Sequence, residues 1–144
     1  MWETIAAEAE AESALWAAAL RAPAERELEP VFSPLAAARY ALGLETIYEG
    51  YLVHYGRPRL FRRLDADDAL LLGDYLYAHG LVRIAALGEL DVVAALAELI
   101  ARCAHLRAEG RPGDGEAWAS TASRLGDGAG NLERALAAHS RRVG

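Results

Sequence analysis

Apolar residues recur along most of the chain at spacings of three and four positions, the period at which a helix presents one face to a protein core. The alternation of apolar and polar residues that marks a strand never continues over a full strand length. The pattern therefore predicts an all-α fold, a helical bundle. The expected helices cover residues 3–21, 35–55, 66–87, 116–125 and 129–141, and a further one begins at Leu90 or Asp91, with apolar positions up to Leu106.

Proline, glycine and capping residues separate these helices. Pro23 ends the first helix. Ser33 is the expected N-cap of the second helix, with Pro34 in its first turn. The turn at residues 56–58, Gly-Arg-Pro, ends the second helix, and Asp65 is the expected N-cap of the third.

The length of 144 residues fits one domain. We assign residues 35–110 to its core, residues 3–21 to an N-terminal helix and about 116–141 to C-terminal helices. Cys103, the only cysteine, excludes an intramolecular disulfide and is expected to be a small core residue.

Charge and composition narrow the possible functions. The net charge of −6 speaks against general nucleic-acid binding. All 15 basic residues are arginines, so chemistry that requires a lysine amine is excluded. No apolar stretch approaches the roughly 18 residues of a membrane span, and the first residues lack a signal-peptide pattern. We therefore expect a cytoplasmic protein without a membrane span.

Helix 66–87 carries leucines in several directions, which predicts that it is covered on nearly all sides. Either the segment 116–141 folds back over the excess apolar surface, or a second chain covers it. We expect the second chain, and hence a dimer with a contact above about 1,000 Å². The expected interface residues are Tyr48, Tyr51, Tyr55, Leu72 and Leu76.

Asp74 lies in the middle of helix 66–87, too far from its start to act as a cap. A buried carboxylate requires a cationic or donor partner, and Arg57, Arg59 and His54 are the candidates. Gly73 beside it indicates a close approach of another backbone. A buried pair that locks two helices together is the expected role.

Two further pairs could carry chemistry. Glu45 and Glu49 are four residues apart and share a helix face, where they could bind magnesium or belong to a solvated surface. Arg134 and His139 are spaced as in HEPN-type ribonucleases, which the segment resembles, although Ala135 replaces the polar residue that usually follows the arginine. That resemblance implies RNA cleavage by general acid–base catalysis.

A broader resemblance covers residues 36–110. The turn at 56–58 and the segment Leu-Leu-Gly-Asp-Tyr-Leu-Tyr at 71–77 resemble the trans-isoprenyl diphosphate synthases. The resemblance implies part of the isoprenyl synthase fold and places the first aspartate-rich motif at 45–49. Only the two glutamates keep its acidic character. The second aspartate-rich motif and the diphosphate-binding lysines have no counterpart in the sequence.

These departures make the chain more similar to the non-catalytic small subunit, component I, of two-component heptaprenyl and hexaprenyl diphosphate synthases. That similarity implies an accessory subunit without a cofactor of its own, whose partner is a catalytic subunit, a second copy, or both. It also implies that the chain shapes the product tunnel of its partner. An unrelated helical interaction protein and a HEPN-like ribonuclease are the alternatives.

Overall fold

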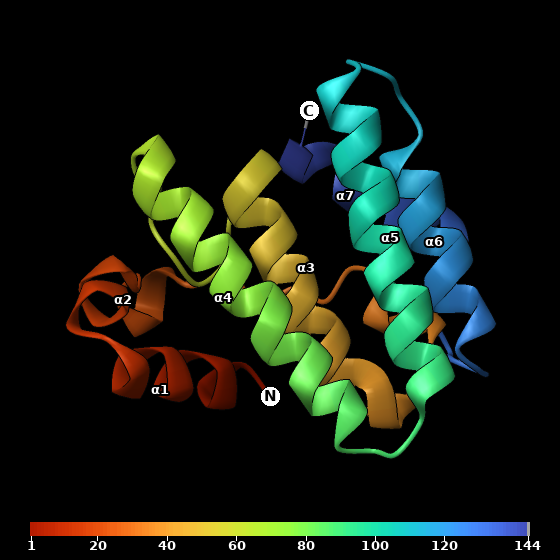
Figure 1. Ribbon diagram of the computed structural model, residues 1–144, viewed down its shortest axis with the longest axis horizontal. Helices are drawn as coiled ribbons and strands as arrows, with labels where there is room; N and C mark the ends of the chain where they lie inside the picture. The colour runs from red at the N-terminus through yellow and green to blue at the C-terminus, as the bar shows by residue number, and fades with distance from the viewer. Residues whose placement is uncertain (144) are drawn as a thin grey trace.

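The computed structural model describes residues 1–143, which form seven α-helices and confirm the all-α prediction. The helices are α1 (Trp2–Glu12), α2 (Ala14–Ala19), α3 (Ala41–Tyr55), α4 (Ala66–Ala85), α5 (Leu90–Ala108), α6 (Asp114–Arg124) and α7 (Leu132–Val143). In Figure 1, α3 and α4 lie together at the centre, with α1 and α2 on one side and α5 and α6 on the other. Within the described span, no helix is both long and apolar enough to cross a membrane.

The central helices α3 and α4 are antiparallel and pack closely because glycines face glycines. Gly43 lies opposite Gly80, and Gly50 lies opposite Gly73. A β-carbon on Gly50 would lie 2.9 Å from the carbonyl oxygen of Gly73, so a side chain there would force the two backbones apart. The expectation that Gly73 marks a close backbone approach is confirmed.

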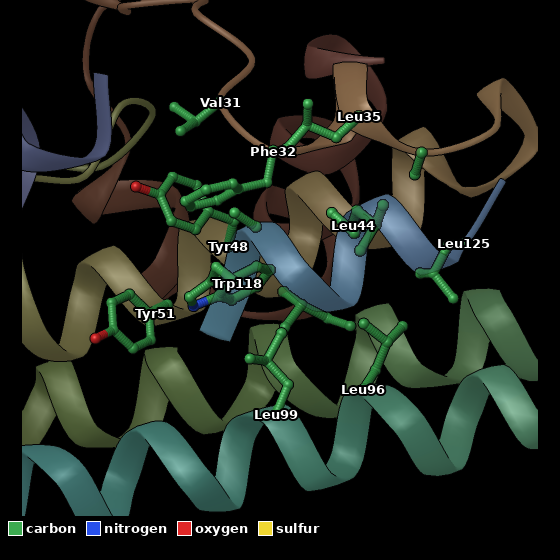
Figure 2. Close-up of a cluster of buried hydrophobic side chains, with 14 of the residues drawn as sticks. Val31, Phe32, Leu35, Leu44, Tyr48, Tyr51, Leu96, Leu99, Trp118 and Leu125 are labelled. Atoms are coloured by element: carbon green, nitrogen blue, oxygen red, sulfur yellow. The ribbon is translucent and has the colours of Figure 1, made fainter. Parts of the chain in front are cut away.

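One hydrophobic cluster lies on each side of this pair. The larger joins α3 to α5, α6 and α7, and Figure 2 shows Phe32, Tyr48 and Trp118 meeting within it. The rings of Phe32 and Trp118 stack with centroids 5.6 Å apart, a contact worth about 0.5–1.5 kcal/mol beyond burial. The smaller cluster joins α1 and α2 to α4 and includes Ile5, Trp16, Phe61, Leu72 and Leu76.

The N-terminal segment differs from its prediction. The expected helix 3–21 is divided into α1 and α2, because the backbone is extended at Ser13. The Ser13 hydroxyl accepts a hydrogen bond from the N–H of Leu15 at 3.0 Å and caps α2. A serine side chain that bonds to nearby backbone competes with helix continuation, and here it interrupts the helix.

The start of α3 also differs. Ser33 does not cap a helix that begins at residue 35; two 3₁₀ turns come first, and α3 begins at Ala41. The Ser33 hydroxyl instead donates a hydrogen bond to a carboxylate oxygen of Glu45 at 3.2 Å. Tertiary contact with a buried acid therefore replaces the expected local cap.

The later boundaries lie close to those expected. Asp65 caps α4 by accepting a hydrogen bond from the N–H of Asp68 at 2.9 Å, as predicted. α4 ends two residues earlier than expected, and α5 begins at Leu90. α7 begins at Leu132 instead of residue 129, because the preceding segment packs on the chain near Pro34, whose oxygen accepts a hydrogen bond from the N–H of Gly130 at 2.8 Å.

Four of the five expected interface residues lie inside the protein. Tyr48 and Tyr51 are buried in the larger cluster, and Leu72 and Leu76 in the smaller one, while Tyr55 packs at the edge of the larger cluster. The prediction that Tyr48, Tyr51, Leu72 and Leu76 form an interface is wrong, because α6 and α7 fold back over α3 and α1 and α2 fold over α4. The outward face of α4 instead exposes Leu70, Leu71 and Val82.

Candidate functional site

Glu45 and Glu49 lie inside the protein with Arg59 between them, and none of the three has exposed surface. Arg59 donates hydrogen bonds from Nη1 to Glu45 and from Nε to Glu49, both at 2.9 Å. The main-chain N–H groups of Arg59 and Leu60 also donate to Glu49, at 2.9 and 2.8 Å. Glu49 therefore fixes the connector after α3 as well as the guanidinium group.

Arg59 occupies the space between the two carboxylates. Burial alone would lower the pKa of its guanidinium, but Glu45 and Glu49 raise that pKa above its ordinary value, so the group stays charged. The guanidinium also lies 4.6 Å from the centre of the Trp2 ring, which covers it. Its Nη1 donates to the main-chain oxygen of Glu29 at 2.8 Å.

This enclosure does not provide the magnesium site considered from the sequence. Magnesium keeps several water ligands and binds through one or two open carboxylates and substrate phosphates, whereas Glu45 and Glu49 are closed off by Arg59. The solvated-surface interpretation is also wrong, because both side chains are fully buried. Among residues 1–143, no group of three or more His, Cys, Asp or Glu side chains could hold a metal ion.

Asp74 is paired as expected but not buried. Its carboxylate lies 3.2 Å from Nε2 of His54, and its side chain is 64% exposed. The prediction of burial is wrong because Asp74 lies on the outward face of α4, and only the His54 ring is enclosed. Of the other two candidate partners, Arg57 is exposed and lies 3.7 Å from Glu27, and Arg59 pairs with Glu45 and Glu49.

A second polar network, which the sequence did not indicate, lies at the start of α6. The carboxylate of Asp114 accepts hydrogen bonds from Tyr51 and, at 2.7 Å, from Nη2 of Arg107. Nε2 of His139 lies 3.2 Å from the same oxygen, and Nδ1 of His139 lies 2.7 Å from the hydroxyl of Tyr48. These contacts connect α3, α5, α6 and α7.

The network stabilises the ionised form of Asp114. Burial alone would raise the pKa of the Asp114 carboxyl, but hydrogen bonds from His139, Tyr51 and Arg107 together hold it well below its usual range. The pKa of Tyr51 is raised, chiefly by burial and then by its bond to Asp114. The network is a partly buried junction of four helices. The sequence hints at it only through the aspartate that begins a helix after Gly110 and Gly113.

The ribonuclease interpretation required Arg134 and His139 to act together. His139 is buried and engaged by Tyr48 and Asp114. Arg134 is exposed and lines a surface cavity of about 960 Å³ to which His139 does not contribute. The structure therefore does not bring the two side chains into one site.

Cys103 is a buried core residue, as the sequence predicted. Burial raises the pKa of its thiol to about 12, and the nearby Asp114 carboxylate adds to the rise. A thiol in this environment is a poor nucleophile.

No family model, curated protein or solved structure matches this chain.

Proposed function

We propose that this chain is a non-catalytic accessory subunit that associates with a catalytic polyprenyl diphosphate synthase subunit. The proposal rests on the resemblance of residues 36–110 to the isoprenyl diphosphate synthases and on one observation. At 45–49, where that resemblance places the first aspartate-rich motif, Arg59 pairs with both remaining acids and encloses them. A chain that uses these acids for internal packing is suited to association with an enzyme and not to turnover.

The outward face of α4 is the surface that we assign to the partner. Leu70, Leu71 and Val82 are 55%, 57% and 65% exposed. Single exposed apolar residues are ordinary, but these share one face of one helix, which is typical of a contact surface. The same face carries Asp74, the aspartate of the segment that resembles the synthases.

Co-expression with the complete polyprenyl diphosphate synthase of the source organism tests the association. We expect the two chains to copurify, and we expect L70D/L71D to lower the captured synthase at least tenfold. The matched control is L28D/L132D, because these two leucines are similarly exposed but lie outside α4. Failure to copurify, or equal loss with both variants, would contradict the proposal.

The pure chain provides a second test. With allylic diphosphate, isopentenyl diphosphate and magnesium, we expect no prenyl transfer. Steady turnover that is lost in E45Q/E49Q would contradict the non-catalytic role. Without a partner, the α4 face is expected to pair two copies of the chain, and light scattering at micromolar concentration distinguishes that dimer from a 15.5 kDa monomer.

A further inference from the structure

A groove of about 680 Å³ lies where the C-terminal ends of α3 and α7 meet the start of α4 and the connector between α3 and α4. Its lining contains no aspartate or glutamate, although the chain as a whole has a net charge of −6. Arginines dominate its charged lining. They are Arg57, Arg62, Arg63, Arg141 and Arg142.

Carboxylates beside the groove balance this charge only in part. Glu27 lies 3.7 Å from Arg57 and 3.5 Å from Arg142, and Glu29 lies 3.6 Å from Arg141. Asp74 lies 3.2 Å from Nε2 of His54, which also lines the groove. Five guanidinium groups against these three carboxylates leave a local formal charge of 5 − 3 = +2 within residues 1–143.

Two of the arginines have no acidic partner. Within residues 1–143, neither Arg62 nor Arg63 lies within ion-pair distance of a carboxylate, although Nε of Arg62 donates to the main-chain oxygen of Ala18 at 3.2 Å. Both are exposed. The aspartates at the start of α4 lie nearby in sequence but do not line the groove.

Arg142, unlike the exposed Arg62 and Arg63, is fixed in place and makes this end of the groove rigid. Its side chain is buried, and Nη1 donates to the main-chain oxygen of Arg57 at 3.2 Å. The N–H of Arg57 in turn donates to the main-chain oxygen of Arg142 at 2.9 Å. These bonds join the end of α7 to the turn after α3 and hold the two walls of the groove in place.

We infer that this groove binds a phosphate group, with Arg57, Arg62 and Arg63 as its ligands. Guanidinium groups bind phosphate oxygens in pairs of parallel hydrogen bonds, and a dianion relieves the repulsion among like charges in the groove. Val53, Leu64 and Val143 also line the groove, so a phosphate ester would find apolar contacts for its organic part. The inference does not depend on the accessory-subunit role.

Calorimetric titration with inorganic phosphate at low ionic strength tests the site. We expect saturable binding that weakens at least tenfold in R62Q/R63Q. The matched control R102Q/R111Q removes the same charge from exposed arginines outside the groove and should change the affinity less than twofold. R63Q alone leaves the hydrogen bond from Arg62 to Ala18 intact and should lower the phosphate affinity by an intermediate amount. A loss of affinity in this variant cannot be ascribed to the breaking of that bond.

The arms of the experiment also distinguish the source of the phosphate. A parallel titration uses phosphatidylglycerol vesicles in place of inorganic phosphate. If the protein binds inorganic phosphate but not the vesicles, its ligand is a small molecule. Binding of both indicates a lipid headgroup as the physiological source. Absence of saturable phosphate binding, or an equal loss in R102Q/R111Q, would overturn the inference.

Discussion

Arg59 is held by Glu49 through both its side chain and its main chain, at distances of 2.9 Å from Nε and 2.9 Å from the main-chain nitrogen. The side chains of both residues are completely buried. A buried ion pair is costly to break, because the remaining charge stays without compensation in a medium of low polarity.

Replacement of Arg59 by methionine should therefore destabilise the protein severely. R59M leaves Glu45 and Glu49 buried without a cation, and we expect the free energy of unfolding to fall by about 3–5 kcal/mol. Urea denaturation followed by circular dichroism measures this change. R63M, at an exposed arginine of the same connector, should change the stability by less than about 0.5 kcal/mol. A loss for R59M within 1 kcal/mol of the control would show that the acids are not buried as described.

The glycine contact between α3 and α4 gives a second prediction. In G50A the new β-carbon lies 2.9 Å from the carbonyl oxygen of Gly73. This atom belongs to the backbone of α4 and cannot rotate away as a side chain could. We expect a loss of about 1–3 kcal/mol from overpacking, although alanine is the better helix former by about 1 kcal/mol. A thermal unfolding curve that is unchanged or shifted upward would contradict the close contact.

G73A is the matched comparison for G50A, because the three atoms nearest to its β-carbon would all belong to the ring of His54. The destabilisation of G73A should therefore largely disappear in the H54A background, whereas that of G50A should remain. A double-mutant cycle measures both couplings. Equal behaviour of the two glycines would mean that His54 does not fill the space above Gly73.

The sequence predicted the class of fold well because helix periodicity is a local property. The caps and breaks that depend on neighbouring residues, such as Asp65 before α4 and the turn at 56–58, were found where expected. Ser33 shows the limit of that reasoning, since its hydroxyl bonds to Glu45, twelve residues away. Local patterns could not show that a tertiary acceptor would compete with a helix cap.

The candidate site was harder to predict because burial depends on the arrangement of whole helices. Arg59 was considered a partner for Asp74, yet it pairs with Glu45 and Glu49 of α3. The sequence does not show which side of α4 faces the core, so it could not show that Asp74 lies on the outward side. Asp114 was missed because its partners, His139 among them, come from three other helices.

Cys103 gives a test of the larger cluster. Its thiol has no exposed surface, and burial raises its pKa to about 12, so a disulfide reagent at pH 8 should react only when the structure opens. We expect labelling in native buffer to be at least 100-fold slower than in 8 M urea. Similar rates in the two solutions would mean that α5 does not cover the thiol.

The pair of His54 and Asp74 makes the stability of the protein depend on pH in mild acid. Burial is the main cause of the lowered pKa of His54, and the carboxylate of Asp74 opposes that effect. In the unfolded chain the imidazole has its ordinary pKa of 6.5. Between the folded pKa and 6.5 the unfolded state therefore binds more protons, and the free energy of unfolding decreases as the pH falls through that window.

D74N removes the carboxylate that favours the protonated ring, so the pKa of His54 should fall further. The pH range in which stability falls with acid then widens. Between pH 7.5 and pH 5 the variant should therefore lose more stability than the wild type. At pH 7.5 the two proteins should differ little, because His54 is neutral in both. Proton NMR titration of the His54 ring, assigned with H54Q, measures the midpoint directly. D67N changes an exposed aspartate of the same helix and should leave that midpoint in place. A midpoint that rises in D74N, or that moves equally in D67N, would show that the carboxylate 3.2 Å away does not stabilise the charged imidazole.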